Sequence, residues 1–372
     1  MKKIAFYLPQ FHEIEENNEW WGEGFTEWTN VKKSKPLFLG HDQPRIPMNN
    51  NYYDLSNIHV MDDQAKLARS YGLDAFCFYH YYFKDGKTLL EKPLENFLSS
   101  DIDIDYCFCW ANESWTRNWD GKNKKVLMMQ DYGNQNDWSK HFDYMLKYFC
   151  DDRYIKLENK PVFLIYKIED IPNFNDFCQY WNKLAVLNGF DGIEFIAVKR
   201  QKNISFSELN LRYSVAFEPF YSLSSTDSLS KYYKLSGGVF KSLAVKSYDF
   251  FTNISYKLGF RDSFAIDYQK IVVKSINNQK NESDSLIPGC FVDWDNSPRR
   301  GVKAIIFKGF TIDIFSDYVK SIFKIAKNEN KPFVFINAWN EWAEGTYLEP
   351  DVKHGHRVLE AVHRASIECE GK

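Results

Sequence analysis

The sequence predicts a (β/α)8 barrel with long loops after its strands. Eight short and almost continuously apolar runs are spaced along the chain, as expected for parallel strands buried on both faces. Helical patterns occupy most of the gaps between these runs, which is the alternating order of a parallel sheet. A doubly wound open sheet is the alternative fold. It is disfavoured because no Gly-x-Gly-x-x-Gly turn follows the first run.

The predicted strands are short apolar runs bounded by glycine, proline or polar residues. They cover residues 4–8, 75–79, 104–110, 162–166, 193–198, 214–217, 286–291 and 333–336. The predicted helices show apolar residues at helical spacing. They cover residues 56–71, 93–98, 137–149, 175–187, 264–276, 313–326 and 355–367. Ser56 is expected to cap the first helix, and Gly72 to end it.

Three stretches show no regular period. Residues 9–55 and 277–285 are predicted to be loops. Residues 221–262 are rich in serine, lysine and tyrosine, and we interpret them as a partly helical insertion. Residues 1–372 are otherwise expected to form one catalytic domain around a single barrel.

Composition limits the classes of partner. Hydrophobic residues make up 44% of the 372 residues, which is enough for a large core. The formal net charge is −3 and no basic block is present, so nucleic acid and anionic membrane surfaces are disfavoured. No run approaches the roughly 18 apolar residues of a membrane span. Residues 1–9 lack the cleavage site of a signal peptide and are interpreted as the first strand, so a cytoplasmic location is expected.

Neither a metal nor another cofactor is expected. The seven cysteines are scattered, and the spacing of Cys107 and Cys109 does not match a zinc site. They are therefore interpreted as reduced core residues. Among the eight histidines, only His354 and His356 are close in sequence. The chain also lacks a P-loop and a nucleophile elbow.

Polar and aromatic residues gather directly after six of the predicted strands. The carboxyl ends of barrel strands meet at one face, where the active sites of such barrels lie. Nine of the eleven tryptophans fall in these clusters, and a pyranose has an apolar face and a polar rim that suit them. The sequence therefore predicts a glycan-binding site. Its candidate substrate-binding residues are His12, Trp21, Glu27, His80, Tyr81, Trp110, Asn112, Glu113, Trp115, Trp294, Asp295, Trp339 and Asn340.

Glu341 and Glu344 follow the last predicted strand and are the candidate catalytic residues. On a helical turn their spacing would place the Cβ atoms about 5–6 Å apart. Glycoside cleavage uses two carboxyl groups whose pKa values are separated by their surroundings, and Trp339 and Trp342 could supply a dry wall. Two alternatives stay open: Glu344 could pair with an arginine while Glu341 alone is catalytic, or Glu113 could be the second acid. Sugar binding is the preferred role for Glu113.

Six motifs together resemble the WbsX-type family, which occurs in polysaccharide and O-antigen gene clusters and is often called a glycosyltransferase. They include Leu-Pro-Gln-Phe-His at 8–12 and Trp-Trp-Gly-Glu-Gly-Phe-Thr-Glu-Trp at 20–28, with the segments 76–82, 109–113, 294–299 and 337–351. The resemblance covers nearly the whole chain. That family is similar in turn to glycoside hydrolase family 99, which comprises endo-acting α-mannosidases with a (β/α)8 barrel. This second likeness depends mainly on Asn-Glu-Trp-Ala-Glu-Gly-Thr at 340–346.

The resemblance to family 99 implies separate roles for the two glutamates. Glu341 would take a proton from the substrate's 2-hydroxyl, which then attacks the anomeric carbon and forms a 1,2-anhydro sugar. Glu344 would protonate the leaving oxygen and later activate water, so that configuration is retained without a covalent enzyme intermediate. The expected function is therefore a retaining glycoside hydrolase acting on an oligosaccharide or polysaccharide. The alternatives are a glycosyltransferase of O-antigen or surface polysaccharide (lipopolysaccharide) biosynthesis, and a non-catalytic glycan-binding barrel.

Overall fold

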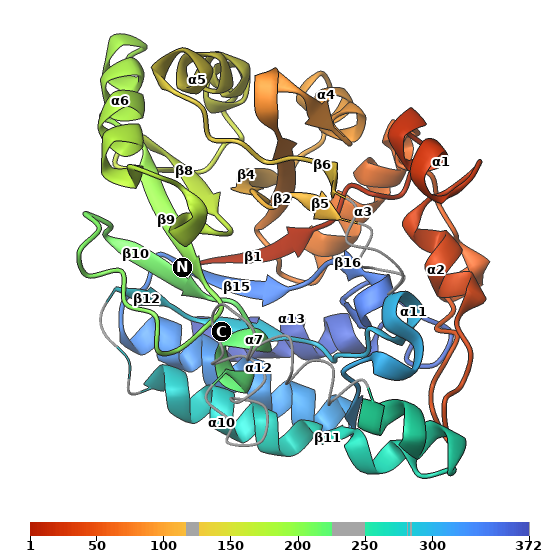
Figure 1. Cartoon of the computed structure of the whole chain (residues 1–372). Coiled ribbons are helices and arrows are strands. Elements are labelled where there is room, and N and C mark those ends of the chain that lie inside the picture. Colours follow the sequence, from red (N-terminus) through yellow and green to blue (C-terminus); the bar gives the residue numbers. More distant parts are fainter. Residues whose placement is uncertain (117–125, 225–249, 281, 283–284, 372) are drawn as a thin grey trace.

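Eight strand positions form a nearly closed and mainly parallel barrel (Figure 1). The computed structural model of the chain describes residues 1–116, 126–224, 250–280, 282 and 285–371. The barrel strands are β1 (Lys2–Tyr7), β2 (Ala75–Tyr82), β4 (Asp105–Trp110), β8 (Lys160–Ile165), β9 (Glu194–Lys199), β10 (Tyr213–Ala216), β12 (Leu286–Ile287) with β13 (Gly289–Phe291), and β15 (Phe333–Asn337). Each pairs with its neighbour in parallel, and β15 returns to β1. The predicted (β/α)8 barrel is confirmed.

The seventh strand position consists of two short strands, β12 and β13, separated by Pro288. Because the two strands pair with different neighbours, together they connect the two ends of the sheet. β12 pairs with β10, whereas β13 pairs with β15. Gly289 begins β13, and a Cβ atom there would lie 2.1 Å from the carbonyl oxygen of Ala216 in β10. The side chain of Gln279 accepts a hydrogen bond from the Gly289 amide at 2.8 Å and donates to its carbonyl at 2.9 Å. The barrel therefore requires a residue without a side chain at position 289.

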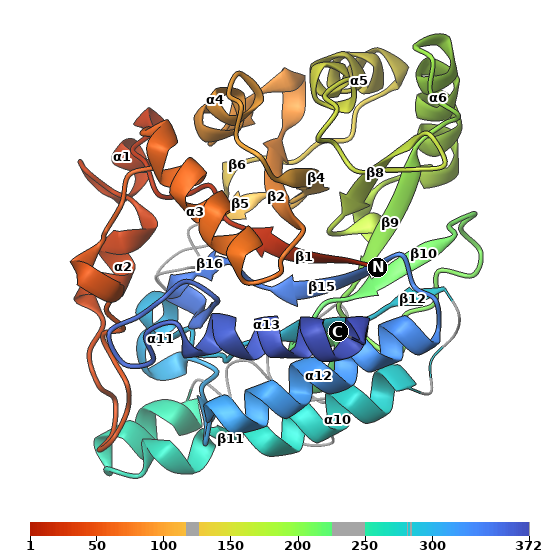
Figure 2. The same ribbon diagram turned by 180° about the vertical axis from the view of Figure 1, so that it is seen from behind.

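Amphipathic helices cover the outside of the barrel. They are α3 (Ile58–Ser70), α4 (Lys92–Leu98), α5 (Gln135–Phe149), α6 (Phe174–Leu187), α10 (Tyr268–Lys280), α12 (Ile312–Asn328) and α13 (Arg357–Glu370). Figures 1 and 2 show α4, α5 and α6 on one side of the barrel and α10, α12 and α13 on the opposite side. None of the helices in the described part of the chain is long and apolar enough to cross a membrane.

Short elements gather at the end of the barrel toward which the strands run (Figure 1). They are α1 (Glu15–Trp21), α2 (Glu27–Lys33), α11 (Ser297–Arg300), the hairpin of β5 (Trp115–Thr116) and β6 (Val126–Met128), and the hairpin of β16 (Asn340–Glu341) and β17 (Thr346–Tyr347). The remaining short elements are β3 (Thr88–Leu89), β7 (Lys156–Leu157), α7 (Phe220–Leu223), β11 (Ile266–Asp267) and β14 (Phe307–Lys308).

The predicted loop 9–55 was wrong in part, because it contains α1 and α2. Both helices have only seven residues, too few to be stable alone, and tertiary packing supports α2. Trp28 of α2 is buried, donates its indole N–H to the carbonyl of Tyr53 at 2.8 Å, and packs against Trp342 with ring centroids 5.4 Å apart. Such long-range contacts leave no periodic signal in a short segment.

Two other predicted boundaries differ from the structure. Asn57, not Ser56, caps α3, because its side chain accepts a hydrogen bond from the His59 amide at 3.2 Å. The helix predicted over 264–276 is α10, which begins at Tyr268 and continues to Lys280, since Gln279 uses its polar side chain to hold Gly289. Most of the insertion predicted over 221–262 falls on residues 225–249, which lie outside the described residues.

Candidate active site

A cavity of about 290 Å³ lies at the carboxyl ends of the barrel strands. Side chains within β2, and side chains that follow β1, β4, β8, β10, β13 and β15, contribute to it. Its lining residues are Leu8, Gln10, Tyr79, Tyr81, Ala111, Glu113, Ser114, Trp115, Thr116, Tyr166, Phe217, Arg299, Glu341 and Glu344. Both candidate catalytic glutamates and three of the candidate binding residues, Tyr81, Glu113 and Trp115, thus share one cavity.

Strand alternation decides which residues of β2 reach this cavity. Successive side chains of a strand point to opposite faces, and Tyr79 and Tyr81 line the cavity. His80 lies on the other face, where its Nε2 is 2.9 Å from Nε2 of His141 in α5. Burial lowers the pKa of His80 to about 3 and also lowers that of His141, so this pair is neutral at pH 7. The structure therefore places His80 between the barrel wall and α5, away from the glutamates.

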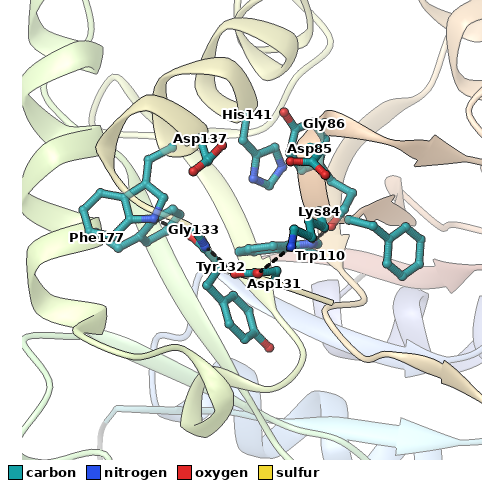
Figure 3. Close-up of a pocket in the computed structure, with 13 residues that line it drawn as sticks. Lys84, Asp85, Gly86, Trp110, Asp131, Tyr132, Gly133, Asp137, His141 and Phe177 are labelled. Atoms are coloured by element: carbon teal, nitrogen blue, oxygen red, sulfur yellow. Dashed lines mark hydrogen bonds and ion pairs between the residues drawn. The ribbon is translucent and has the colours of Figure 1, made fainter. Parts of the chain in front are cut away.

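Trp110 lies on the same outward face, because β4 pairs its Trp110 with His80 of β2. Its indole N–H donates to the carbonyl of Tyr82 at 3.0 Å, and its ring packs against His141. Together with Asp85 and Asp131, these two aromatic groups line a separate pocket of about 60 Å³ (Figure 3). This pocket lies outside the barrel wall and is too small for a sugar ring.

The hairpin after β15 carries the two glutamates. Glu341 ends β16, whereas Glu344 lies in the 3-10 turn of Trp342–Glu344 that connects β16 to β17. Gly345 then adopts a positive φ of 67°, and a Cβ atom there would lie 2.9 Å from the backbone nitrogen of Asp295. The close approach of Gly345 to Asp295 packs the glutamate turn against the segment that leads into α11.

Arg299 of α11 connects three carboxyl groups, of which Glu27 and Glu341 are buried and Glu344 is partly exposed. Its Nη1 donates to Glu344 Oε1 at 2.6 Å, and its Nη2 donates to Glu341 Oε2 at 3.2 Å. Its Nε donates to Glu27 Oε1 at 2.8 Å. Glu341 and Glu344 therefore point toward a common guanidinium group at the bottom of the cavity.

Burial shifts the protonation of this pair. Burial and the neighbouring Glu344 raise the pKa of Glu341 to about 8, against the opposing effect of Arg299. Burial also raises the pKa of Glu344, again opposed by Arg299. Because a charged carboxyl group is disfavoured where water is scarce, the two groups together retain a proton near pH 7. A donor and an acceptor of protons can therefore coexist in the cavity.

Aromatic rings form the walls of the cavity. Trp115 packs edge-on against Tyr81 at 5.2 Å and against Trp20 of α1 at 5.8 Å. Tyr166 and Phe217 also line the cavity and pack edge-on against each other at 5.4 Å. Burial raises the pKa values of Tyr79, Tyr81 and Tyr166, so their hydroxyl groups stay protonated and can donate hydrogen bonds to a ligand.

Glu113 lies at the rim of the cavity and not at its bottom. Its side chain is 42% exposed, and its Oε1 is 2.7 Å from Nζ of Lys167. Arg200 approaches the same oxygen at 4.0 Å. An exposed carboxylate at this position is suited to hydrogen bonding with sugar hydroxyls.

Five other candidate binding residues support the loops around the cavity and do not line it. The Asn112 side chain bonds to the backbone N–H and carbonyl of Lys167 at 2.8 and 2.7 Å. The Asn340 side chain bonds in the same way to Leu8, at 2.7 and 3.0 Å. Asp295 accepts from Gln43 at 2.6 Å. Trp294 packs against Phe220, and Trp339 packs against Phe76.

The remaining candidates are Glu27, His12 and Trp21. Glu27 does not line the cavity but reaches it through Arg299. His12 is buried, and its Nδ1 lies 3.1 Å from the carbonyl of Pro9. Trp21 ends α1 and packs against Phe25, with ring centroids 5.9 Å apart. In the described residues, no group of three or more metal-ligating side chains is positioned to hold a metal ion.

The cavity is also lined by residues that are not among the binding residues predicted from the sequence, namely Arg299, Gln10, Tyr79, Tyr166 and Phe217. Tyr79 could have been found, because it lies two positions from Tyr81 and therefore on the same face of β2. Tyr166 and Phe217 directly follow their strands, as catalytic-face residues do. The three contacts of Arg299 join segments more than 40 residues apart and leave no local signal.

The fold and the cavity define a (β/α)8 barrel with an acidic pair, on the hairpin after its last strand, in an aromatic-walled pocket. The family model described as Glycosyltransferase WbsX matches residues 3–362, and the chain belongs to this family. Two proteins named uncharacterized protein WxcX, from two strains of Xanthomonas campestris pv. campestris, are 35% and 34% identical to it over 372 and 367 residues. Each match covers 97% of this chain and 49% of the relative, so the chain spans about half the length of these curated relatives.

Solved structures of similar fold include glycoside hydrolases. The GH99 endo-alpha-mannosidase from Bacteroides thetaiotaomicron superposes with a TM-score of 0.54 at 13% identity, over 99% of this chain and 97% of that one. A protein described as glycoside hydrolase-like gives a TM-score of 0.56 at 13% identity, over 98% and 93% of the two chains. At this level of identity the similarity establishes a shared barrel fold. The predicted resemblance to the WbsX-type family is confirmed, and the predicted likeness to family 99 is confirmed at the level of the fold.

Proposed function

We propose that this chain is a retaining glycoside hydrolase that cleaves a glycan through Glu341 and Glu344. One observation carries the proposal: both carboxyl groups contact one buried guanidinium at the bottom of an aromatic-walled cavity. Such a pair can hold a proton and accept one within the same small space, which is what glycosidic bond cleavage needs. The single-domain organisation and the cytoplasmic location expected from the sequence stay predictions.

The cavity suits a sugar in size and in surface. Small-molecule sites have volumes of roughly 300–1,000 Å³, and this cavity, at about 290 Å³, holds little more than one ring. Trp115 offers a flat apolar surface, while Tyr79, Tyr81 and Glu113 offer polar groups around it. A longer glycan would extend past Glu113 at the rim.

In the proposed reaction, Glu341 accepts the proton of the substrate's 2-hydroxyl, and that oxygen attacks the anomeric carbon. Glu344 donates a proton to the leaving oxygen, and the resulting 1,2-anhydro sugar is opened by a water molecule that Glu344 deprotonates. As the anhydro ring opens, Glu341 returns its proton to the 2-oxygen, so each carboxyl group regains its starting protonation state. Because Glu341 holds the proton more strongly in the unliganded structure, that proton must move to Glu344 when the substrate binds.

The alternative is a glycosyltransferase, and it is favoured by the family's description. The experiment that separates the two incubates the purified protein with mannose-type and other oligosaccharides, with and without nucleotide-sugars. We expect new reducing ends to appear without any nucleotide-sugar. Tight binding of a nucleotide-sugar, together with glycan extension that depends on it, would replace the hydrolase by the transferase.

Replacement of Trp115 by alanine is expected to weaken glycan binding. Loss of a stacking surface of this kind costs about 1.4 kcal/mol, which corresponds to a tenfold higher KM. We expect kcat to change little, since the ring would contact substrate and transition state equally. Steady-state kinetics check this expectation, with Leu187→Ala as a control on an 81% exposed side chain of α6. An unchanged KM would show that the glycan does not contact Trp115.

A further inference from the structure

Glu27 is an acidic residue that the proposed reaction does not use, although it is joined to the catalytic pair. It is fully buried in the first turn of α2. Its Oε1 accepts from Arg299 Nε at 2.8 Å, and its Oε2 has no hydrogen-bond partner among the described residues. A buried carboxylate with one unpaired oxygen is costly to keep unless its charge serves its neighbours.

We propose that Glu27 and Arg299 form a positioning pair that keeps one proton on the Glu341–Glu344 pair. This inference deepens the proposed function and depends on it. Arg299 holds both catalytic carboxyl groups in place through two of its nitrogens. Glu27 accepts a hydrogen bond from the third nitrogen of Arg299 and balances the positive charge of the guanidinium. Because its charge is balanced, the guanidinium cannot stabilise both catalytic carboxyl groups as anions at the same time.

A charge count supports this arrangement. One guanidinium contacts three carboxyl groups, two of them buried, and full ionisation would leave a net charge of −2 in a site with little access to water. If Glu27 neutralises Arg299, the catalytic pair carries a charge of −1 with one proton bound. Without the Glu27 charge, Arg299 would offset one more negative charge, and the pair would release its proton at a lower pH.

The contacts also indicate which group holds the proton. Arg299 lies 2.6 Å from Glu344 but 3.2 Å from Glu341. The side chain of Glu344 is 24% exposed, whereas that of Glu341 is 8% exposed. The shorter contact and the greater access to water both favour the anion at Glu344. In the unliganded protein the proton therefore resides on Glu341.

The other described titratable groups around the catalytic pair do not cancel the effect of Glu27 on the protonation of that pair. Tyr79 and Tyr81 of β2 face Glu341, and burial raises their pKa values, so they remain neutral. Tyr166 after β8 also remains protonated for the same reason. Glu113 pairs with Lys167 at 2.7 Å and lies 4.0 Å from Arg200, and no ion pair joins these two cations to Glu341 or Glu344 among the described residues. Among the residues that the structure describes, Arg299 is thus the cation in direct contact with the catalytic pair.

The decisive variant is Glu27→Gln, which removes the charge and keeps an oxygen that can accept from Arg299. We expect the catalytic pair to lose its proton about one pH unit lower than in the wild type. Carbon-13 NMR of glutamate-labelled, unliganded protein measures this titration directly, with Glu341→Gln used to assign the signal. Arg299→Gln should move the same titration to higher pH. Glu158→Gln, at an exposed ion pair with Arg212, should leave it unchanged.

The titration needs no substrate, so its outcome is independent of whether the protein is a hydrolase. If Glu27→Gln leaves the titration of the pair in place, or moves it upward, the inference is wrong even if the protein cleaves glycans. If the titration shifts as expected but no glycan is cleaved, the proposed hydrolase function is wrong. The inference that Glu27 and Arg299 keep one proton on the Glu341–Glu344 pair is then still supported. Should Glu27→Gln not fold, Glu27→Asp decides, because it moves the carboxylate away from Arg299 and should also lower the titration of the pair; an unchanged titration would overturn the inference. In an active enzyme, the basic limb of the pH profile of kcat/KM moves with the titration.

Discussion

Replacement of Glu341 or Glu344 by glutamine is expected to reduce glycan cleavage by about 10²–10⁴-fold, the usual contribution of a general acid or base. Glutamine keeps the shape of the side chain and can still accept a hydrogen bond from Arg299, so the loss reports on proton transfer and not on folding. Reducing-end release on purified variants measures the effect. Glu158→Gln changes the same residue type at an exposed ion pair and should retain full activity.

The two variants should differ in their response to the leaving group. A substrate with a good leaving group needs little protonation, so Glu344→Gln should recover much of its rate on an aryl glycoside. Glu341→Gln should not recover, because attack by the 2-hydroxyl still requires a base. The reverse pattern would exchange the roles of the two groups. Full activity in both variants would remove them from the catalytic machinery.

Gly289→Ala is expected to destabilise the protein by about 3 kcal/mol, at the upper end for an overpacked site. The new Cβ atom would lie 2.1 Å from the Ala216 carbonyl oxygen, a backbone atom of the neighbouring strand. The barrel can admit it only by separating β10 from β13. That separation would also weaken the two hydrogen bonds between Gln279 and Gly289. Urea unfolding followed by circular dichroism measures the loss.

Gly309→Ala is the matched control for this prediction. It adds the same methyl group where no atom lies within 4 Å, at a φ of 85°. The expected cost is about 1 kcal/mol, from the left-handed backbone alone. Equal destabilisation by the two variants would show that the close approach of β10 and β13 is not needed to close the barrel.

The sequence predicted the barrel well because buried parallel strands are apolar on both faces, and each predicted strand lies at an observed strand position. It also placed Glu341 and Glu344 at the end of the last strand, where the structure has them. Strand ends were therefore predictable. The direction in which each side chain points was harder to predict. His80 and Tyr81 are adjacent polar residues near the end of β2, but they face opposite sides of the strand.

Polar residues near the cavity were hardest to interpret. Asn112 and Asn340 have the residue type of sugar-binding groups, yet both use their amides to hold backbone segments in place. Arg299 shows the opposite case, because its importance comes from three partners that are distant in sequence. Such roles depend on which segments the fold brings together, and local patterns do not contain that information.

The most direct test of the central claim is a crystal structure of Glu341→Gln soaked with mannose-type and other oligosaccharides. We expect a sugar ring in the cavity against Trp115, with its 2-hydroxyl at residue 341 and its glycosidic oxygen within hydrogen-bond reach of Glu344. A glycan bound elsewhere on the surface, or with its anomeric carbon remote from both positions, would contradict the proposed catalytic pair.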